Sequence, residues 1–484
     1  MKITHRPLIA ISRGLVGAQS GQARADTLKH KLPELHHPHR YRSAPLAPKK
    51  SAMRYGFFWS LAAVAILTMT HAVTTTAAQG VTPEQSLPQG LLPSDWPWWR
   101  GPTHNGEAPR GQSPPLSWSD QVNVQWSVNI PGRGHGSPIV AGDRIYLASC
   151  DEPSGSQSVY AFDRTDGTLA WARQIYASKA MRKNERSTGA SSTIACDGTR
   201  LFINFLNDGE VSTTALSLVG ATLWQTKLTD YIIHQGYGSS PLIYRDTVIV
   251  SADNKGGGAV AAINRQSGEI LWKRERPPTP NYSSPVVHTL HGREQLIMIG
   301  CDLVSSFDPA SGETIWERKG ATTECVTTTV SDGQRIFTSG GYPRNHVAAI
   351  RADGSAKIDW ENEQRLYVPS LLYSGGHLYA VLDAGIAICW NSETGEERWK
   401  SRLGGNFSAS PVLVGDMIFA TSEAGQTHIF RATPDRFEAL ATNALGQEVF
   451  ATPAICGDQI FFRVAYFEGN IRQEKLVCIA DLKK

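Results

Sequence analysis

The residues best placed to do chemistry in this sequence lie just ahead of eight pairs of small residues. We call these pairs the markers: Ser137-Pro138, Ser192-Thr193, Ser240-Pro241, Ser284-Pro285, Thr328-Thr329, Pro369-Ser370, Ser410-Pro411 and Thr452-Pro453. Aromatic rings can stack on a ligand, and Arg, Glu, His and Asn can hydrogen bond to it, so the set suits binding of a polar polymer or a peptide. The candidates for ligand or partner binding are Arg133, His135, Glu185, Arg186, His234, Tyr237, Asn281, Tyr282, Glu324, Arg365, Tyr367 and Asn406. The alternative is that the aromatic members, with Phe407 and Phe450, occupy repeat-equivalent positions and plug a channel.

The most highly charged of these segments is residues 181–186, MRKNER. We predict that this segment is the first candidate for a partner contact. An ordinary solvated loop is an equally weighted alternative.

No pattern of a known catalytic or metal centre is present. The seven Cys include no C-x-x-C pair, so we expect small buried strand residues, with a chance disulfide left open. His71, His288 and His291 show no metal-ligand spacing with a carboxylate or Cys, and no nucleophile elbow occurs at a strand-to-helix turn. We therefore expect no catalytic and no metal-ligating residues.

The charge distribution argues against nucleic acid as a partner. The formal net charge is +3, but the first 54 residues carry 11 Lys/Arg against two Asp/Glu, so the remainder carries −6. A composition of 41% hydrophobic and 19% charged residues is that of a soluble globular protein.

The N-terminal region has the order of a secretory signal. Basic residues end at Arg54, an apolar run covers residues 57–69, and small residues follow. We predict that residues 1–52 are untranslated or disordered, with Met53 as the real start, and that residues 53–78 are a signal peptide cleaved near Ala78. The protein would then be periplasmic or extracellular. The alternative is an uncleaved anchor formed by residues 57–69, the one route to membrane association.

Residues 79–122 are predicted to be a linker followed by a Trp-rich segment packed on the main fold. The segment WPWWRGPTHNG covers residues 96–106. We expect its indoles to be buried over one face of the fold and Arg100 to lie near a carboxylate; an aromatic platform for sugar or peptide is the alternative.

Residues 123–484 are built from a repeated hairpin that ends in Trp. Its clearest copy, FDPASGETIWE, covers residues 307–317: Asp308 can accept hydrogen bonds from the turn amides, and Gly312 can take a positive φ. The predicted structural docking residues are Trp126, ahead of the first unit, and the hairpin residues Trp171, Trp224, Trp272, Trp316, Trp360 and Trp399. Each Trp would pack on a neighbouring layer.

The repeat predicts a closed ring. Eight small-residue markers, four short strands in each unit and regular turn signals indicate an all-β, eight-bladed β-propeller of four-stranded antiparallel blades. The last unit has only three strands, and the strand around Trp126 supplies the fourth, so an N-terminal strand would complete the last blade. The connections into the innermost strands would then converge at one mouth of a central channel.

The hairpins AFDRTDGTLAW (161–171) and FDPASGETIW (307–316) resemble the A-x-D-x-x-T-G-x-x-x-W tryptophan-docking motif of the PQQ-binding-like β-propeller repeat proteins. The likeness covers about residues 95 to 484, and WPWWRGPTHNGEA resembles the start of a secreted bacterial branch of that family. The resemblance implies the propeller fold, shared with quinoprotein dehydrogenases and with the lipoprotein that scaffolds outer-membrane barrel assembly.

The resemblance is compatible with two functions. Quinoprotein dehydrogenases are longer than this chain, hold the quinone under adjacent cysteines and bind Ca²⁺ through Glu and Asn. This chain has no Cys-Cys pair, and its Glu185, Asn281 and Asp302 match none of the family's metal ligands. We therefore expect a monomeric binding or scaffolding module without a cofactor, whose partner is an envelope protein, a peptide or a polysaccharide. A PQQ- and Ca²⁺-dependent alcohol or sugar dehydrogenase is the alternative.

Overall fold

The computed structural model describes residues 87–182 and 184–482, and these residues form strands, turns and loops without a helix. No segment of this part is therefore a helix long and apolar enough to cross a membrane. The predicted extension, the signal segment with its start at Met53, and the beginning of the linker lie outside the described residues.

The strands form eight antiparallel sheets of four strands each. The first four blades, from the innermost strand outward, are β2 (Ile139–Ala141), β3 (Arg144–Asp151), β4 (Ser156–Asp163), β5 (Leu169–Tyr176); β6 (Ala195–Cys196), β7 (Arg200–Asn207), β8 (Glu210–Ser217), β9 (Thr222–Asp230); β10 (Leu242–Tyr244), β11 (Thr247–Ser251), β12 (Gly258–Asn264), β13 (Ile270–Arg276); and β14 (Val286–Leu290), β15 (Arg293–Gly300), β16 (Leu303–Phe307), β17 (Thr314–Lys319).

The remaining four blades continue the same order. They are β18 (Val330–Ser331), β19 (Arg335–Gly340), β20 (His346–Arg351), β21 (Ile358–Asn362); β22 (Leu372–Ser374), β23 (His377–Val381), β24 (Ile386–Asn391), β25 (Glu397–Arg402); β26 (Val412–Val414), β27 (Met417–Thr421), β28 (Gln426–Arg431), β29 (Ala439–Ala444); and β30 (Ala454–Cys456), β31 (Gln459–Glu468), β32 (Ile471–Ala480) with β1 (Val124–Ile130).

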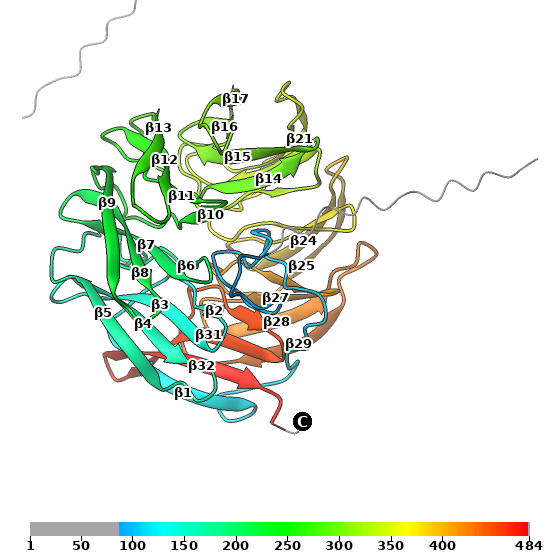
Figure 1. Ribbon diagram of the computed structural model, residues 1–484. Helices are drawn as coiled ribbons and strands as arrows, with labels where there is room; N and C mark the ends of the chain where they lie inside the picture. Colours follow the sequence, from blue (N-terminus) through cyan, green and yellow to red (C-terminus); the bar gives the residue numbers. More distant parts are fainter. Residues whose placement is uncertain (1–86, 183, 483–484) are drawn as a thin grey trace, which may run out of the picture. The chain divides into compact units, whose positions relative to one another are not determined.

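The eight blades surround a common axis, which confirms the predicted propeller (Figure 1). Strand β1 pairs antiparallel with β32, and Trp126 lies opposite Cys478. The eighth blade is thus completed by a strand that precedes the first blade, so closure joins the first and last strands of the described residues.

The hairpin of residues 307–317 has the geometry that its sequence predicts. The amides of Ala310 and Ser311 donate to Asp308 Oδ1 at 3.0 and 3.1 Å, and Gly312 has φ of +70°. A Cβ on Gly312 would lie 2.6 Å from the indole of Trp272 in the preceding blade. The glycine therefore leaves room for a neighbouring indole as well as allowing the turn.

Indoles from successive outer strands cover the hairpin of the next blade in the same way. The covered glycines are Gly167 under Trp126, Gly220 under Trp171, Gly268 under Trp224, Gly312 under Trp272, and Gly395 under Trp360. Trp316 instead packs in one cluster with Ala356, and Trp399 packs 5.6 Å from the ring of Phe437. Where the glycine is absent, a small or aromatic side chain takes its place.

The small-residue markers join the blades around the axis. At six blade junctions the backbone N–H of one marker donates to the marker hydroxyl of the next blade, over 2.9–3.0 Å: Ser137 to Thr193, Thr193 to Ser240, Ser240 to Ser284, Thr328 to Ser370, Ser370 to Ser410, and Ser410 to Thr452. These bonds satisfy buried N–H groups that the sheets leave unpaired.

The Trp-rich segment lies across the axis, and we call residues 95–108 the strap (Figure 1, in blue near the centre of the ring). Trp96 pairs with Val140 of the first blade, and Ala108 donates to Leu413 O of the seventh blade at 2.7 Å. Trp96 and Trp98 are buried and Trp99 is half-buried, as predicted for indoles over one face.

The position of Arg100 differs from the prediction. Its guanidinium is buried without an ion pair among the described residues and donates instead to the carbonyls of Leu371, Pro411 and Asn105. The first two carbonyls precede the innermost strands of the sixth and seventh blades, so the cation satisfies backbone acceptors that the strap removes from water. Burial lowers the pKa of Arg100 to about 9.

All seven cysteines are free and buried, as expected for small strand residues. Burial also raises their pKa values, so none is a reactive thiolate at neutral pH.

Candidate functional site

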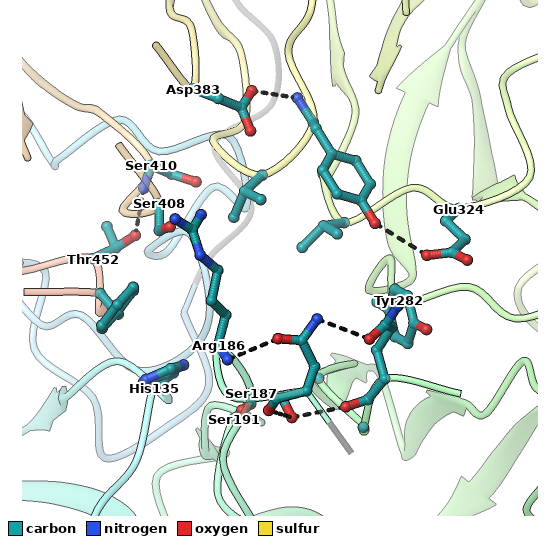
Figure 2. Close-up of a pocket in the computed structure, with 18 of the residues that line it drawn as sticks. His135, Arg186, Ser187, Ser191, Tyr282, Glu324, Asp383, Ser408, Ser410 and Thr452 are labelled. Carbon is teal, nitrogen blue, oxygen red and sulfur yellow. Dashed lines mark hydrogen bonds between the residues drawn. The ribbon is translucent and has the colours of Figure 1, made fainter. Parts of the chain in front are cut away.

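A cavity of about 740 Å³ occupies one end of the central channel. We call this end the mouth; it is formed by the connections into the innermost strands and by loops between the second and third strands of three blades. Figure 2 shows Glu324 and Tyr282 on one side of the cavity and His135 and Thr452 on the other. The volume falls in the range of sites for small organic ligands.

Nine of the twelve predicted binding residues line this cavity: His135, Arg186, His234, Tyr237, Tyr282, Glu324, Arg365, Tyr367 and Asn406. Each of them lies just ahead of an innermost strand, and together they represent every blade junction except one. The aromatic members, with Phe407 and Phe450, line the cavity rather than fill it.

Three predicted residues lie elsewhere. Arg133 is not part of the lining, and its Nη1 lies 3.7 Å from Glu152 Oε2; Glu185 is exposed on the adjoining loop. Asn281 is buried, and its amide donates to Asp253, Ser283 and the carbonyl of Ile299 over 2.8–3.0 Å. Because these bonds use the whole amide nitrogen within the blades, Asn281 is a packing residue and faces no ligand.

One wall of the cavity carries a buried carboxylate with two donors. Glu324 Oε1 lies 2.9 Å from His234 Nε2, and Tyr367 Oη donates to Glu324 Oε2 at 3.1 Å. Burial and then Glu324 raise the pKa values of Tyr367 and Tyr282, so both phenols stay protonated donors. A carboxylate oxygen has two lone pairs, so Glu324 can still accept hydrogen bonds from a ligand.

The opposite wall combines a rim ion pair with a stacked ring pair. Arg186 Nη1 lies 3.7 Å from Glu423 Oε1, which also accepts a hydrogen bond from Ser408 at 2.6 Å. His135 stacks on Phe450 with 4.4 Å between ring centroids. Burial, followed by Arg133 and two further arginines, lowers the pKa of His135 well below its usual value, so its imidazole is neutral at pH 7.

A second carboxylate lies beside the first wall. The Tyr367 N–H donates to Asp383 Oδ2 at 2.7 Å, and burial raises the pKa of Asp383. Arg365 donates to Gly341 O at 3.2 Å and lies 5.4 Å over the ring of Tyr367. Both arginines of the lining therefore have partners in the protein.

Sequence reasoning missed Asp383, Glu423 and Trp99. The first two occupy the same loop of successive blades, in LDAG (382–385) and SEAG (422–425), 40 residues apart. That spacing is a signal, because residues one repeat apart in a propeller share a face. Trp99 belongs to the strap, and no repeat relates it to the mouth.

The donors present do not match a calcium–quinone pair. No cysteine lines the cavity, and the described part of the chain contains no group of three or more His, Cys, Asp or Glu arranged to hold a metal ion. The lining therefore does not fit PQQ with Ca²⁺.

Comparison with known proteins identifies sequence relatives of this chain. The sequence profile described as "Outer membrane protein assembly factor BamB" matches residues 119–230, 157–401 and 368–435, overlapping as expected for a repeat. The chain is similar to a BamB from Yersinia pestis, at 22% identity over 64% of this chain and 76% of that protein. It is also similar to a polyvinylalcohol dehydrogenase of Sphingopyxis, at 23% identity over 66% of this chain.

The length matched differs between the two kinds of relative. The chain spans 30% and 45% of the two polyvinylalcohol dehydrogenases that it matches. A quinohemoprotein alcohol dehydrogenase from Comamonas testosteroni superposes with a TM-score of 0.58 at 12% identity, covering 80% of this chain and 81% of that one. At that identity the superposition shows the fold alone.

Proposed function

The chain belongs to the family of the outer membrane protein assembly factor BamB, and from that premise we propose that it is an exported propeller that binds a protein segment or a polymer in its axial cavity, without redox chemistry of its own. The observation that carries the proposal is the cavity itself, in which aromatic rings and hydrogen-bonding groups from many blades face one space. Connections held between paired strands position these groups, so little order has to be gained on binding.

The chemistry of the lining supports a binding role. Glu324, His234 and Tyr367 form a connected polar cluster beside aromatic surface, and a few fixed polar groups in a largely apolar cleft orient a ligand. Each of these side chains has a hydrogen-bonding partner within the chain, as expected of a binding surface that is preorganised for its ligand.

We also propose that the protein is periplasmic or extracellular. The signal order of residues 53–78 supports this, as does the similarity to BamB, an outer membrane protein assembly factor. Cell fractionation with N-terminal sequencing of the mature chain tests it. A start near residue 79 in an exported fraction is expected, and a cytoplasmic protein with an intact N-terminus contradicts the proposal.

A pull-down from envelope extracts tests the binding role. We expect Arg186→Ala and Tyr282→Ala to lower partner recovery, because both side chains line the cavity. Arg398→Ala, on the outer strand β25, is the matched control and should recover the partner like the unaltered protein. Equal recovery from all four proteins argues against the mouth as the binding surface.

A PQQ-dependent alcohol or sugar dehydrogenase is the second candidate. The similarity to polyvinylalcohol dehydrogenases favours it, and the cavity volume is compatible with an organic cofactor. Dye reduction by alcohols or sugars is measured after the purified protein is incubated with PQQ and Ca²⁺. We expect no reduction above that of a boiled control; alcohol-dependent reduction supports the dehydrogenase and rejects the first proposal.

A further inference from the structure

The cavity is closed at the end opposite its mouth. The strap lies across the innermost strands there, and Trp99 forms part of the cavity floor while its indole N–H donates to Thr328 Oγ1 at 2.9 Å. Among the described residues, none of the turns that follow the innermost strands contributes to the lining. The channel is therefore a blind cup, and a polymer cannot thread through it.

The charged groups of the lining, two arginines and three carboxylates, are all paired within the protein. Its arginines are Arg186, which faces Glu423, and Arg365, which donates to a backbone carbonyl. Of its carboxylates, Glu423 and Glu324 each have a donor or cation in the protein, and Asp383 accepts the N–H of Tyr367. Groups that are paired in this way complement a neutral ligand rich in hydroxyl groups.

At most of its junctions the cup offers a peptide strand no free marker N–H group. Peptides that add to a sheet edge use its free backbone N–H and C=O groups. At six junctions the marker N–H groups are already donated to hydroxyls of the neighbouring blade. Recognition must therefore come from side chains, and flat aromatic rings such as Trp99, Tyr282 and Phe450 suit the C–H faces of sugar rings.

Building on the proposed binding function, we propose that the cup is an end-recognition site for a neutral polyhydroxylated chain, of which an oligosaccharide is the representative. Aromatic side chains stack on the terminal units, and the Glu324 cluster accepts hydrogen bonds from their hydroxyl groups. Because the strap closes the floor, a terminus of the chain enters through the mouth and an internal segment does not. The volume of about 740 Å³ holds a few units only.

Isothermal titration calorimetry on the full exported chain tests this inference. The probes are linear hexasaccharides of α-1,4-glucose, β-1,4-glucose and β-1,4-N-acetylglucosamine, each compared with a derivative that carries a bulky aryl group at both ends. We expect at least one uncapped hexasaccharide to bind with a Kd below about 1 mM, and its doubly capped derivative to bind at least about tenfold more weakly. Absence of binding by all three, or equal binding of capped and uncapped forms, overturns the inference.

Two variants locate the site. Glu324→Gln should weaken binding of the hexasaccharide about tenfold, because a neutral amide is a weaker acceptor than a carboxylate. Since Glu324 is buried, Asn406→Ala, at an exposed position of the lining, is the second variant and should weaken binding without disturbing the fold. Glu313→Gln, on an exposed hairpin, is the matched control and should bind normally. Unchanged affinity in both cavity variants contradicts the assignment.

The two proposals fail in different ways. If the pull-down partner is lost in Arg186→Ala but no hexasaccharide binds, the mouth binds a protein and the end-recognition inference is wrong. If a hexasaccharide binds and no envelope partner is recovered, the inference stands and the protein-binding form of the proposed function falls.

Discussion

Single residues decide how the strap is held over the channel. Arg100 donates to carbonyls of two different blades, and His104 stacks on Trp98 with 4.9 Å between ring centroids. Both side chains are buried, so each must be satisfied by groups that the strap itself covers. Two predictions follow from their surroundings.

Arg100→Lys should lower the free energy of unfolding by about 2 kcal/mol, because one ammonium group cannot reach the carbonyls of Leu371, Pro411 and Asn105 together. Denaturant unfolding followed by tryptophan fluorescence measures the change. Arg398→Lys, at an exposed position of the outer strand β25, is the control and should have little effect. Equal midpoints for the two variants would show that the carbonyl contacts contribute nothing.

His104 should make the protein sensitive to acid. Burial lowers the pKa of His104 to about 3, whereas an unfolded histidine has a pKa near 6.5. The unfolded state therefore binds more protons between these values, so stability is present above pH 6.5 and falls as pH decreases, by at most about 1.4 kcal/mol per pH unit.

His104→Phe keeps a ring on Trp98 and removes the titrating group. The loss of unfolding free energy between pH 7 and pH 5 should be smaller in this variant than in the unaltered protein, while His377→Phe, outside the strap, should not reduce it. The same acid dependence in His104→Phe and the unaltered protein would contradict the assignment.

The hairpin is the element that joins one blade to the next. Its turn needs a residue with positive φ, and its outer face must leave room for the indole of the preceding blade. Gly312 meets both needs, whereas Gly292, in the same blade with φ of +75°, has nothing within 4 Å of an added Cβ. Substitutions at these two glycines therefore separate the free-energy cost of backbone strain from the free-energy cost of displacing the indole.

Gly312→Ala should therefore destabilise the protein by about 3 kcal/mol, from backbone strain and displacement of Trp272 together. Gly292→Ala should cost only about 1 kcal/mol, because strain acts there alone. Thermal or denaturant unfolding compares the two. If both variants lose the same stability, the indole contact is not a significant part of the blade interface.

The whole molecule is a ring closed by sequence-distant segments. Strand β1 completes the eighth blade, and the strap reaches the innermost strands of the first and seventh blades. Closure removes the exposed edge that β32 would otherwise present. Loss of β1 and loss of the strap should therefore have different consequences.

A chain that begins at residue 87 should unfold like the mature protein, and one that begins at residue 110 lacks the strap and should remain folded with a lower midpoint. A chain that begins at residue 131 also lacks β1 and should aggregate or lose cooperative unfolding. Calorimetry with size-exclusion chromatography distinguishes these outcomes. A cooperative monomer from residue 131 would show that β1 is not needed for closure.

The sequence by itself determined the blade count, the closure by β1 and nine residues of the cavity lining. These follow from local signals: a turn that needs Gly312, short strands between regular turns, and a repeat that places equivalent residues at equivalent positions. Nine of the twelve proposed residues face the cavity for that reason.

Only the tertiary structure decided where side chains between the repeats point. Asn281 precedes an innermost strand like its equivalents, yet neighbouring blades offer its amide buried partners, so it turns inward. Arg100 donates to backbone carbonyls and not to a carboxylate, and Trp99 forms part of the cavity floor. Both contacts arise because the strap crosses blades that are remote from it in sequence. Such contacts carry no periodic signal, so packing alone sets whether the channel is open or blind.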